Sequence, residues 1–251
     1  MADRDERQLR RLFCDTGRWM YDRGYVVAAE GSLSARLAEN AYLLTPAERC
    51  LGRLQPEQMV TIDAGGAPQR AGRPQHAGSA PSEDWRLHLT CYRERPDVDF
   101  VVHGHPPWCL AASAAGMSLG RPVLPDVVLH VGTIPTAPYA TPAGQESADS
   151  VRGLIGAHDA IVLDRHGAVT VDRTLEGALM KLEHVELQAR VMMAVESAGM
   201  PRVLPREEVQ KLKGMRAEKS LNPDAVLPDP SWLTGPRGAA PPTEDADRAP
   251  E

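Results

Sequence analysis

Short apolar runs that follow one another with no helical segment between them constrain the fold of this chain most strongly. Residues 160–171 (AIVLDRHGAVTV) indicate two strands joined by a tight turn, and AYLLTP and QMVTID form a similar succession at 41–46 and 58–63. Strands that run parallel need a crossover connection, usually a helix, between them. The pattern therefore predicts an α/β chain with a mixed or mostly antiparallel sheet, rather than a doubly wound one.

Helices are expected around these strands. Apolar positions at helical spacing indicate helices over 5–23 and 174–199, the second ending at Gly199. Ser82 is a good N-cap for a helix over 83–95. The remaining expectations are shorter helices over PPWCLAASAAG and SADSVRGLIGAH, strands in DFVVHGHP and VVLHVGTIPTAPY, and a loop over 64–81.

Composition excludes several classes of protein. A net charge of −6 with scattered basic residues leaves no electrostatic footprint for nucleic acid. No run approaches the roughly 18 apolar residues that a membrane span needs, and the N-terminus lacks an apolar signal core. The four cysteines form no C-x-x-C pair, so we expect reduced thiols in a cytoplasmic protein. We expect one domain over 1–221 and a disordered tail, rich in Pro, Ala and acids, over 222–251.

The histidines offer a candidate metal site. His103 and His105 project from the same face of a strand, because side chains alternate along a strand. His166 lies at a similar strand-to-turn junction, followed by Gly167. Three protein ligands and an open position are typical of a catalytic zinc site, but an H-x-H pair also occurs by chance and sequence alone cannot show convergence. A structural, surface or solvated role is expected for the others: His76, His88, His130, His158 and His184.

A carboxylate near the start of the predicted helix could move a proton. Glu83 and Asp84 precede Trp85, immediately before the segment that leads to the histidine pair. Either acid could act as a general base beside a metal. The alternative is that both simply complement the positive end of the helix dipole.

Six stretches together resemble the class II aldolase/adducin-head family, in family order over roughly residues 8–215. They are EGSLSARL, LLTP, PSEDWRLHLTCYRERPDVDFVVHGHP, LPDVVLHVGTIPTAPYATP, DAIVLDRHGAVTV and LEGALMKLEHVE. Sugar-metabolising members include L-fuculose-1-phosphate aldolase and L-ribulose-5-phosphate 4-epimerase. The resemblance implies a three-layer α/β/α fold around a central, mostly antiparallel sheet. It also implies a homotetramer with active sites at subunit interfaces.

The resemblance also assigns roles to residues. It implies that His103, His105 and His166 bind a divalent metal, with zinc expected first and iron, manganese or cobalt as alternatives. Asp84 stands where the family has a catalytic Glu, one methylene longer, and Glu83 is the second candidate for that role.

The chain departs from the sugar-phosphate members at the loops that bind phosphate. Family pairs Gly-Asn, Ser/Thr-Gly and Ser-Ser are replaced here by Gly31-Ser32, Ala47-Glu48 and Ser82-Glu83. Two added carboxylates repel a phosphate dianion, with Arg49 compensating in part. We therefore expect a small-molecule substrate without phosphate at that position. Asp126 lies in the segment where the fuculose enzyme carries a catalytic Tyr.

These observations leave several functions open. The first is a metal-dependent carbon–carbon lyase of the aldolase type acting on a hydroxy-carbonyl compound, with decarboxylation a close second. A third is a non-haem iron oxygenase of secondary metabolism on the same scaffold. A non-catalytic scaffold like the adducin head is disfavoured, because such heads lose metal ligands whereas this chain keeps three histidines and an acid.

Overall fold

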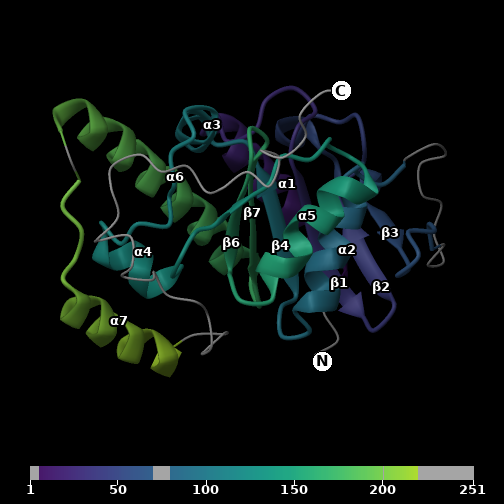
Figure 1. The fold of residues 1–251 in the computed structure, drawn as a ribbon. Coiled ribbons are helices and arrows are strands. Elements are labelled where there is room, and N and C mark those ends of the chain that lie inside the picture. Colours follow the sequence, from purple (N-terminus) through teal and green to yellow (C-terminus); the bar gives the residue numbers. More distant parts are fainter. Residues whose placement is uncertain (1–5, 70–79, 200, 220–251) are drawn as a thin grey trace, which may run out of the picture.

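The computed structural model describes residues 6–69, 80–199 and 201–219 of the 251-residue chain (Figure 1). Within these residues, seven strands form one sheet in the order β3-β2-β1-β4-β7-β6-β5. The strands are β1 (Ser32–Ala38), β2 (Ala41–Leu44), β3 (Val60–Ile62), β4 (Phe100–Gly104), β5 (Thr136–Ala137), β6 (Ala160–Leu163) and β7 (Gly167–Asp172). The α-helices are α1 (Glu6–Asp22), α2 (Trp85–Glu94), α3 (Pro107–Ala114), α4 (Pro125–His130), α5 (Gln145–Ile155), α6 (Leu175–Ala198) and α7 (Arg206–Lys219). Short 3-10 turns span Leu51–Arg53 and Pro56–Gln58.

The sheet is mostly antiparallel, as the missing crossovers predict. Every pair of neighbouring strands is antiparallel except β5 and β6, which run parallel. β6 and β7 form the hairpin expected over residues 160–171, closed by the pair Leu163 and Gly167.

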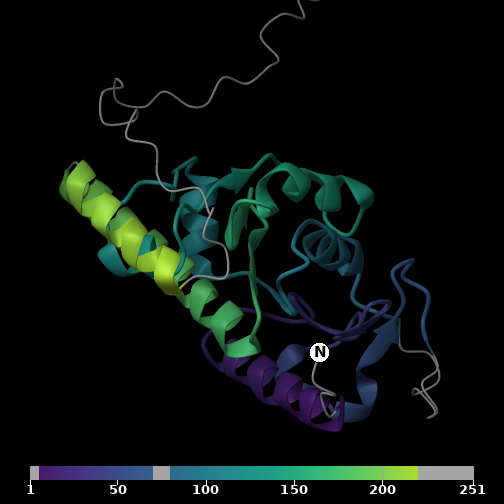
Figure 2. The ribbon, with the colours of Figure 1, turned by 90° about the horizontal axis from the view of Figure 1, so that it is seen from below.

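Helices cover both faces of the sheet and bury two separate apolar cores (Figures 1 and 2). One core joins α1, α3 and α6 to the strands, and the other joins α2 and α5 to the opposite face. Successive strand residues enter opposite cores, as Val101 and Val102 do in β4. On β1, Leu33 enters the first core, whereas the Ser34 hydroxyl contacts His88 of α2 on the other side. The predicted three-layer α/β/α architecture is confirmed.

The segment VVLHVGTIPTAPY was predicted as one or two strands, and that prediction is mostly wrong. Its first part belongs to α4, and its only strand is the two-residue β5. Pro125 occupies the first turn of α4, where its fixed φ and missing N–H suit a helix. An apolar run this short does not distinguish a buried helix from a strand.

The start of α2 also differs from the prediction. The N-cap is Asp84 rather than Ser82, and Asp84 makes no side-chain capping bond. The Ser82 hydroxyl instead accepts a hydrogen bond from the Asp84 backbone N–H at 3.3 Å. The helix therefore begins at Trp85, two residues later than expected.

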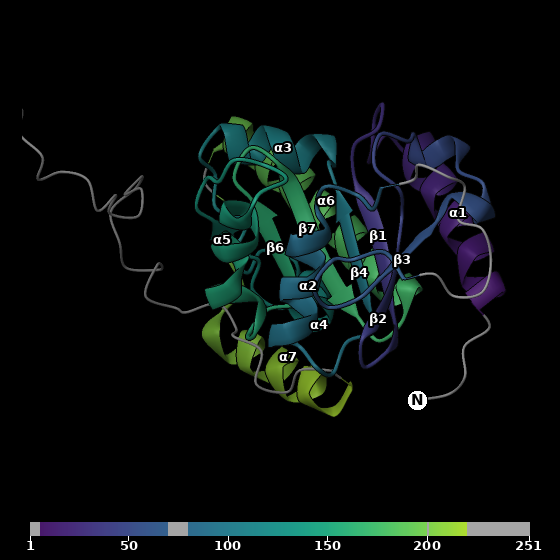
Figure 3. The same cartoon turned by 90° about the vertical axis from the view of Figure 1, so that its right-hand side faces the viewer.

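Helix α7 was not expected from the sequence, because its few apolar residues form no continuous face. It packs against α4 at one edge of the molecule (Figure 3). Arg216 of α7 is 5% exposed and donates hydrogen bonds to the Leu129 carbonyl at 3.1 Å and to Asp159 at 2.8 Å. These two contacts, together with the buried Val209 side chain, fix α7 to the body of the fold.

Some predictions fall partly or wholly outside the described residues. These are the tail over 222–251, the boundary at residue 221, His76, and most of the loop over 64–81. None of the helices described combines the length and apolar character needed to cross a lipid bilayer.

The buried carboxylate of Asp159 forms ion pairs with side chains of α6, α7 and the end of α2. Asp159 is 1% exposed and accepts hydrogen bonds from Arg95 (2.8 Å), Lys181 (2.9 Å) and Arg216 (2.8 Å). Burial alone would raise its pKa, but Lys181, Arg95 and Arg216 together hold that pKa below its ordinary value of 3.8. These ion pairs therefore stabilise the folded state at pH values above 3.8, and their contribution is lost as the pH falls through the lower pKa that Asp159 has in the folded protein.

We predict that Asp159→Asn lowers the free energy of unfolding by about 3–5 kcal/mol at neutral pH, because it leaves three buried cations without their shared partner. Urea unfolding followed by circular dichroism measures the change. The matched control is Asp97→Asn, which removes a partly exposed partner of the same Arg95 and should cost about 1 kcal/mol or less. Equal losses in the two variants would contradict the central role of Asp159.

Candidate metal centre

The three candidate histidines meet because β4 pairs with β7. His103 and Gly104 of β4 lie opposite Val169 and Ala168 of β7, so the end of β4 reaches the β6–β7 turn. Gly167 closes this turn with a φ of 90°, and a Cβ there would collide with the Gly104 carbonyl. Glycine therefore lets the two backbones pass close together. The register brings His166, on the turn, beside the pair at the end of β4.

The geometry of the cluster suits one metal ion. The ring centroids of His103, His105 and His166 lie 4.8–5.0 Å apart. One ligand nitrogen from each ring lies within 4.8 Å of the others. Across the described part of the chain, these residues form the one group of three or more His, Cys, Asp or Glu side chains that could hold a metal ion.

The protonation state of the cluster also fits a metal. The Ala168 carbonyl lies 3.0 Å from His103 Nδ1 and can only accept, so Nδ1 carries the hydrogen and Nε2 carries the lone pair, which faces His105 Nε2 at 3.1 Å. A hydrogen bond of this kind fixes the tautomer of metal-binding histidines. Burial, followed by the neighbouring imidazoles, lowers the pKa of His103 and of His105 to about 3. Both rings are therefore neutral at physiological pH, as ligands must be.

Asp84 is the candidate acid that lies against the cluster. Its Oδ2 is 3.8 Å from His103 Nε2 and accepts a hydrogen bond from the Ser32 hydroxyl at 3.2 Å. Glu83, the second candidate, is exposed and lines a neighbouring pocket. The structure thus places Asp84, rather than Glu83, where a proton could be exchanged beside a metal.

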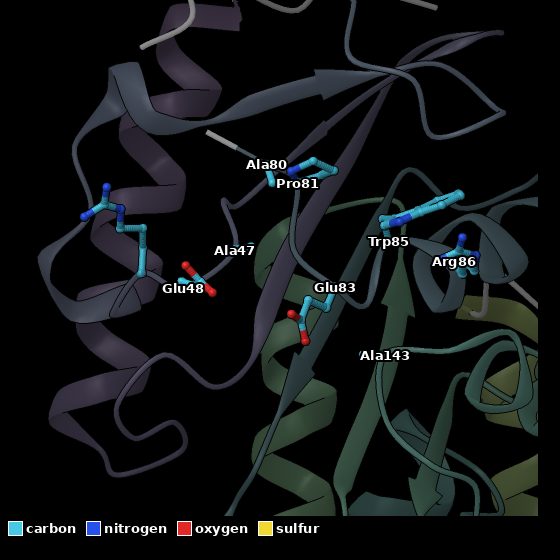
Figure 4. Close-up of a pocket in the computed structure, with 9 residues that line it drawn as sticks. Ala47, Glu48, Ala80, Pro81, Glu83, Trp85, Arg86 and Ala143 are labelled. Carbon is cyan, nitrogen blue, oxygen red and sulfur yellow. The ribbon is translucent and has the colours of Figure 1, made fainter. Parts of the chain in front are cut away.

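A pocket of about 680 Å³ includes part of the expected substrate region, although neither Asp84 nor the three histidines line it (Figure 4). Its lining includes two of the candidate substrate residues, Ala47 and Glu48, together with Glu83. Residues that also line it are Arg49, Ala80, Pro81, Trp85, Arg86 and Ala143. In Figure 4 the Glu48 and Glu83 side chains point toward the same opening. Arg86 has its guanidinium 4.2 Å from the centre of the Trp85 ring, a cation–π contact.

The other candidate substrate residues do not line this pocket. Ser32 and Ser82 are buried, Ser32 within a hydrogen-bond network behind Asp84. Gly31 has a φ of 79°, and a Cβ there would collide with Val26, so glycine is required at this position for the path of the backbone. Asp126 is exposed on α4, a helix that packs on α6 and α7, and it is not among the residues that form the histidine cluster.

Sequence reasoning missed Glu30, whose Oε2 lies 3.7 Å from His105 Nδ1. It also assigned only a structural or surface role to His88, which lies directly behind the Asp84–Ser32 pair. The alternation of Ser32 and Ser34 with apolar residues in β1 was the available signal, because it directs two hydroxyls toward α2. His130, His158 and His184 lie outside the cluster, as predicted.

Comparison with known proteins agrees with this geometry. Residues 11–193 match the model of the class II aldolase and adducin N-terminal domain. The chain is 31% identical to the 3-oxo-tetronate 4-phosphate decarboxylase of Cupriavidus necator, over 76% of this chain and 86% of that protein. It is 30% identical to the L-fuculose phosphate aldolase of Escherichia coli K12, over 86% of this chain and 100% of that protein.

Solved structures show the same fold. The crystal structure of YgbL from Escherichia coli superposes with a TM-score of 0.75 at 29% identity, covering 83% of this chain and 99% of that chain. An L-fuculose 1-phosphate aldolase superposes with a TM-score of 0.74 at 22% identity, covering 82% of this chain and 94% of that chain. The histidine cluster, the fold and the match over residues 11–193 agree, and the chain belongs to the class II aldolase and adducin family.

Proposed function

We propose that this chain is a divalent-metal-dependent carbon–carbon lyase that acts on a small hydroxy-carbonyl compound. The observation that carries the proposal is the convergence of three imidazoles on one point, with the Asp84 carboxylate beside them. Two relatives named above are an aldolase and a decarboxylase, and both reactions break a carbon–carbon bond next to a carbonyl group. Aldol cleavage is the leading reaction, and decarboxylation is the second.

In this proposal, His103, His105 and His166 hold the ion, with zinc first among the candidates. A divalent ion there supplies a Lewis acid, which stabilises negative charge on the substrate as the bond breaks. Asp84 exchanges the proton at the carbon that carries the developing charge. The Ser32 hydroxyl donates to Asp84 and so holds its carboxylate at the cluster.

The pocket lined by Glu48 and Glu83 favours a substrate that carries no phosphate at the end remote from the reacting carbon. Glu48 and Glu83 place two negative charges there, and like charges repel a phosphate dianion. Arg49 and Arg86 also line the pocket, Arg86 with its guanidinium over the Trp85 ring, and their positive charges offset those of the two acids in part. A neutral, hydroxyl-bearing end is compatible with carboxylate acceptors. The homotetramer with interfacial active sites stays a prediction that sizing in solution would test.

We predict that protein purified without added metal or chelator retains about one divalent ion per chain, as expected of a three-ligand catalytic site. His103→Ala should retain less than a tenth of that amount, whereas the matched control His184→Ala, at a half-buried histidine outside the cluster, should retain it all. Elemental analysis measures both. Chelation should abolish lyase activity, and added metal should restore it; release of an aldehyde or of carbon dioxide distinguishes the two reactions.

Zinc in the wild type would support the lyase, and iron would favour the oxygenase alternative. An apoprotein that neither binds nor responds to divalent ions would contradict the proposal.

We predict that Glu48→Gly combined with Glu83→Ser shifts preference toward phosphorylated substrates. The ratio of kcat/KM for a phosphorylated hydroxy-carbonyl compound to that for its unphosphorylated form should rise about tenfold, because two repelling charges are removed. Glycine is suited to position 48, where φ is 54°. Glu94→Ser, which removes an exposed acid at the far end of α2, is the matched control and should leave the ratio unchanged. An unchanged ratio in the double variant would show that these acids do not select the substrate.

A further inference from the structure

A chain of buried polar side chains lies directly behind Asp84, between β1 and α2. Ser32, Ser34 and His88 are fully buried, and Tyr92 is 2% exposed. His88 Nε2 lies 2.8 Å from the Ser32 hydroxyl, and His88 Nδ1 lies 2.6 Å from that of Ser34. The Ser34 hydroxyl also lies 2.8 Å from the Tyr92 hydroxyl. Four contacts therefore connect Tyr92 to Asp84 through one imidazole.

Only one arrangement of hydrogens satisfies all four contacts. A carboxylate can only accept, so the Ser32 hydroxyl must donate to Asp84 Oδ2. Ser32 then has no hydrogen left for His88, so His88 Nε2 carries a hydrogen and donates to Ser32. Burial lowers the pKa of His88 to about 3, so the ring is neutral and its Nδ1 accepts from Ser34. The one hydrogen of the Tyr92 hydroxyl then goes to Ser34, at 2.8 Å, rather than to the Asp99 carbonyl at 3.3 Å, because the Ser34 hydrogen is already donated to His88. Every hydrogen in the chain thus points toward Asp84.

The orientation of Asp84 indicates that this chain acts on it. Asp84 is the N-cap of α2, where an Asp side chain normally accepts a hydrogen bond from the first turn of the helix. Here it makes no such bond and turns toward Ser32 and His103. His88 lies one turn further along α2, and its backbone N–H donates to the Asp84 carbonyl at 3.1 Å. The helix thus fixes the distance between the acid and the imidazole behind it.

We infer that Ser32 and His88 are positioning residues that hold the Asp84 carboxylate toward the metal centre, through a hydrogen-bond chain of fixed direction. The catalytic role of Asp84 in this inference rests on the proposed function. The direction of the hydrogen bonds does not, because it follows from the contacts alone. The chain does not supply protons from solvent, because it ends at the buried Tyr92, whose hydroxyl otherwise contacts only the Asp99 carbonyl at 3.3 Å among the contacts described. Its effect is therefore on geometry.

The direction is tested on the whole protein without any substrate. Nitrogen-15 NMR of the histidine side chains distinguishes the two neutral tautomers, and assignment of His88 follows from the spectrum of His88→Gln. We expect the Nε2–H tautomer in the wild type. The Nδ1–H tautomer would overturn the inference, because His88 could then not donate to Ser32.

The positioning role is tested by kinetics and metal content. Ser32→Ala and His88→Leu should each lower kcat at least tenfold while KM changes less than threefold and the metal content stays the same. His88→Gln should recover most of kcat, because its amide can still donate to Ser32. Thr90→Val is the matched control, because Thr90 is on the same helix and 1% exposed, with no hydrogen bond to its hydroxyl; it should behave as wild type.

Wild-type kcat in Ser32→Ala or His88→Leu, or a loss that His88→Gln does not relieve, would overturn the positioning role. A wild-type protein without lyase activity would instead overturn the proposed function and with it the catalytic role of Asp84, while the NMR result still decides the direction of the chain.

Discussion

The antiparallel pairing of β4 with β7 is the interaction on which the candidate site depends. It fixes His103 opposite Val169, and so places the β6–β7 turn with His166 at the end of β4. A shift of one residue would send His103 to the other face of the sheet, away from α2 and Asp84. The Ala168 carbonyl that orients the His103 ring comes from the same pairing. Backbone register therefore sets both the position and the tautomer of this ligand.

The second half of the site is formed by β1 and by α2, the helix on the face of the sheet toward which His103 points. β1 pairs with β4, with Ser32 opposite His103, so its hydroxyls face α2 near the cluster. Asp84 leaves the first turn of α2 without a side-chain cap, and His88 is buried as a neutral ring. Losing an N-cap bond costs about 1 kcal/mol, and a functional orientation of the carboxylate accounts for that cost. The fold thus gives up some local stability where the proposed chemistry requires a fixed acid.

Much of the fold could be predicted from the sequence, because strands without crossover helices permit few arrangements. The same-side placement of His103 and His105 follows from strand geometry alone. The addition of His166 could not be derived locally, because it depends on a register between strands about 65 residues apart, and the family resemblance supplied it. Helix α4 was missed because its apolar run is short, and α7 because its docking relies on Arg216 and one buried apolar residue, Val209, rather than on a continuous apolar face. The rotation of Asp84 away from its own helix is a tertiary effect that a capping pattern does not contain.

X-ray absorption at the K-edge of the metal retained by the purified protein tests the central claim most directly, because it counts and identifies the ligands. The account predicts scattering from three imidazole rings, with oxygen in the remaining positions. In His166→Ala the imidazole count should fall or the metal should be lost. Sulfur ligands, or a shell of oxygen alone, would contradict the assignment of His103, His105 and His166 as the metal centre.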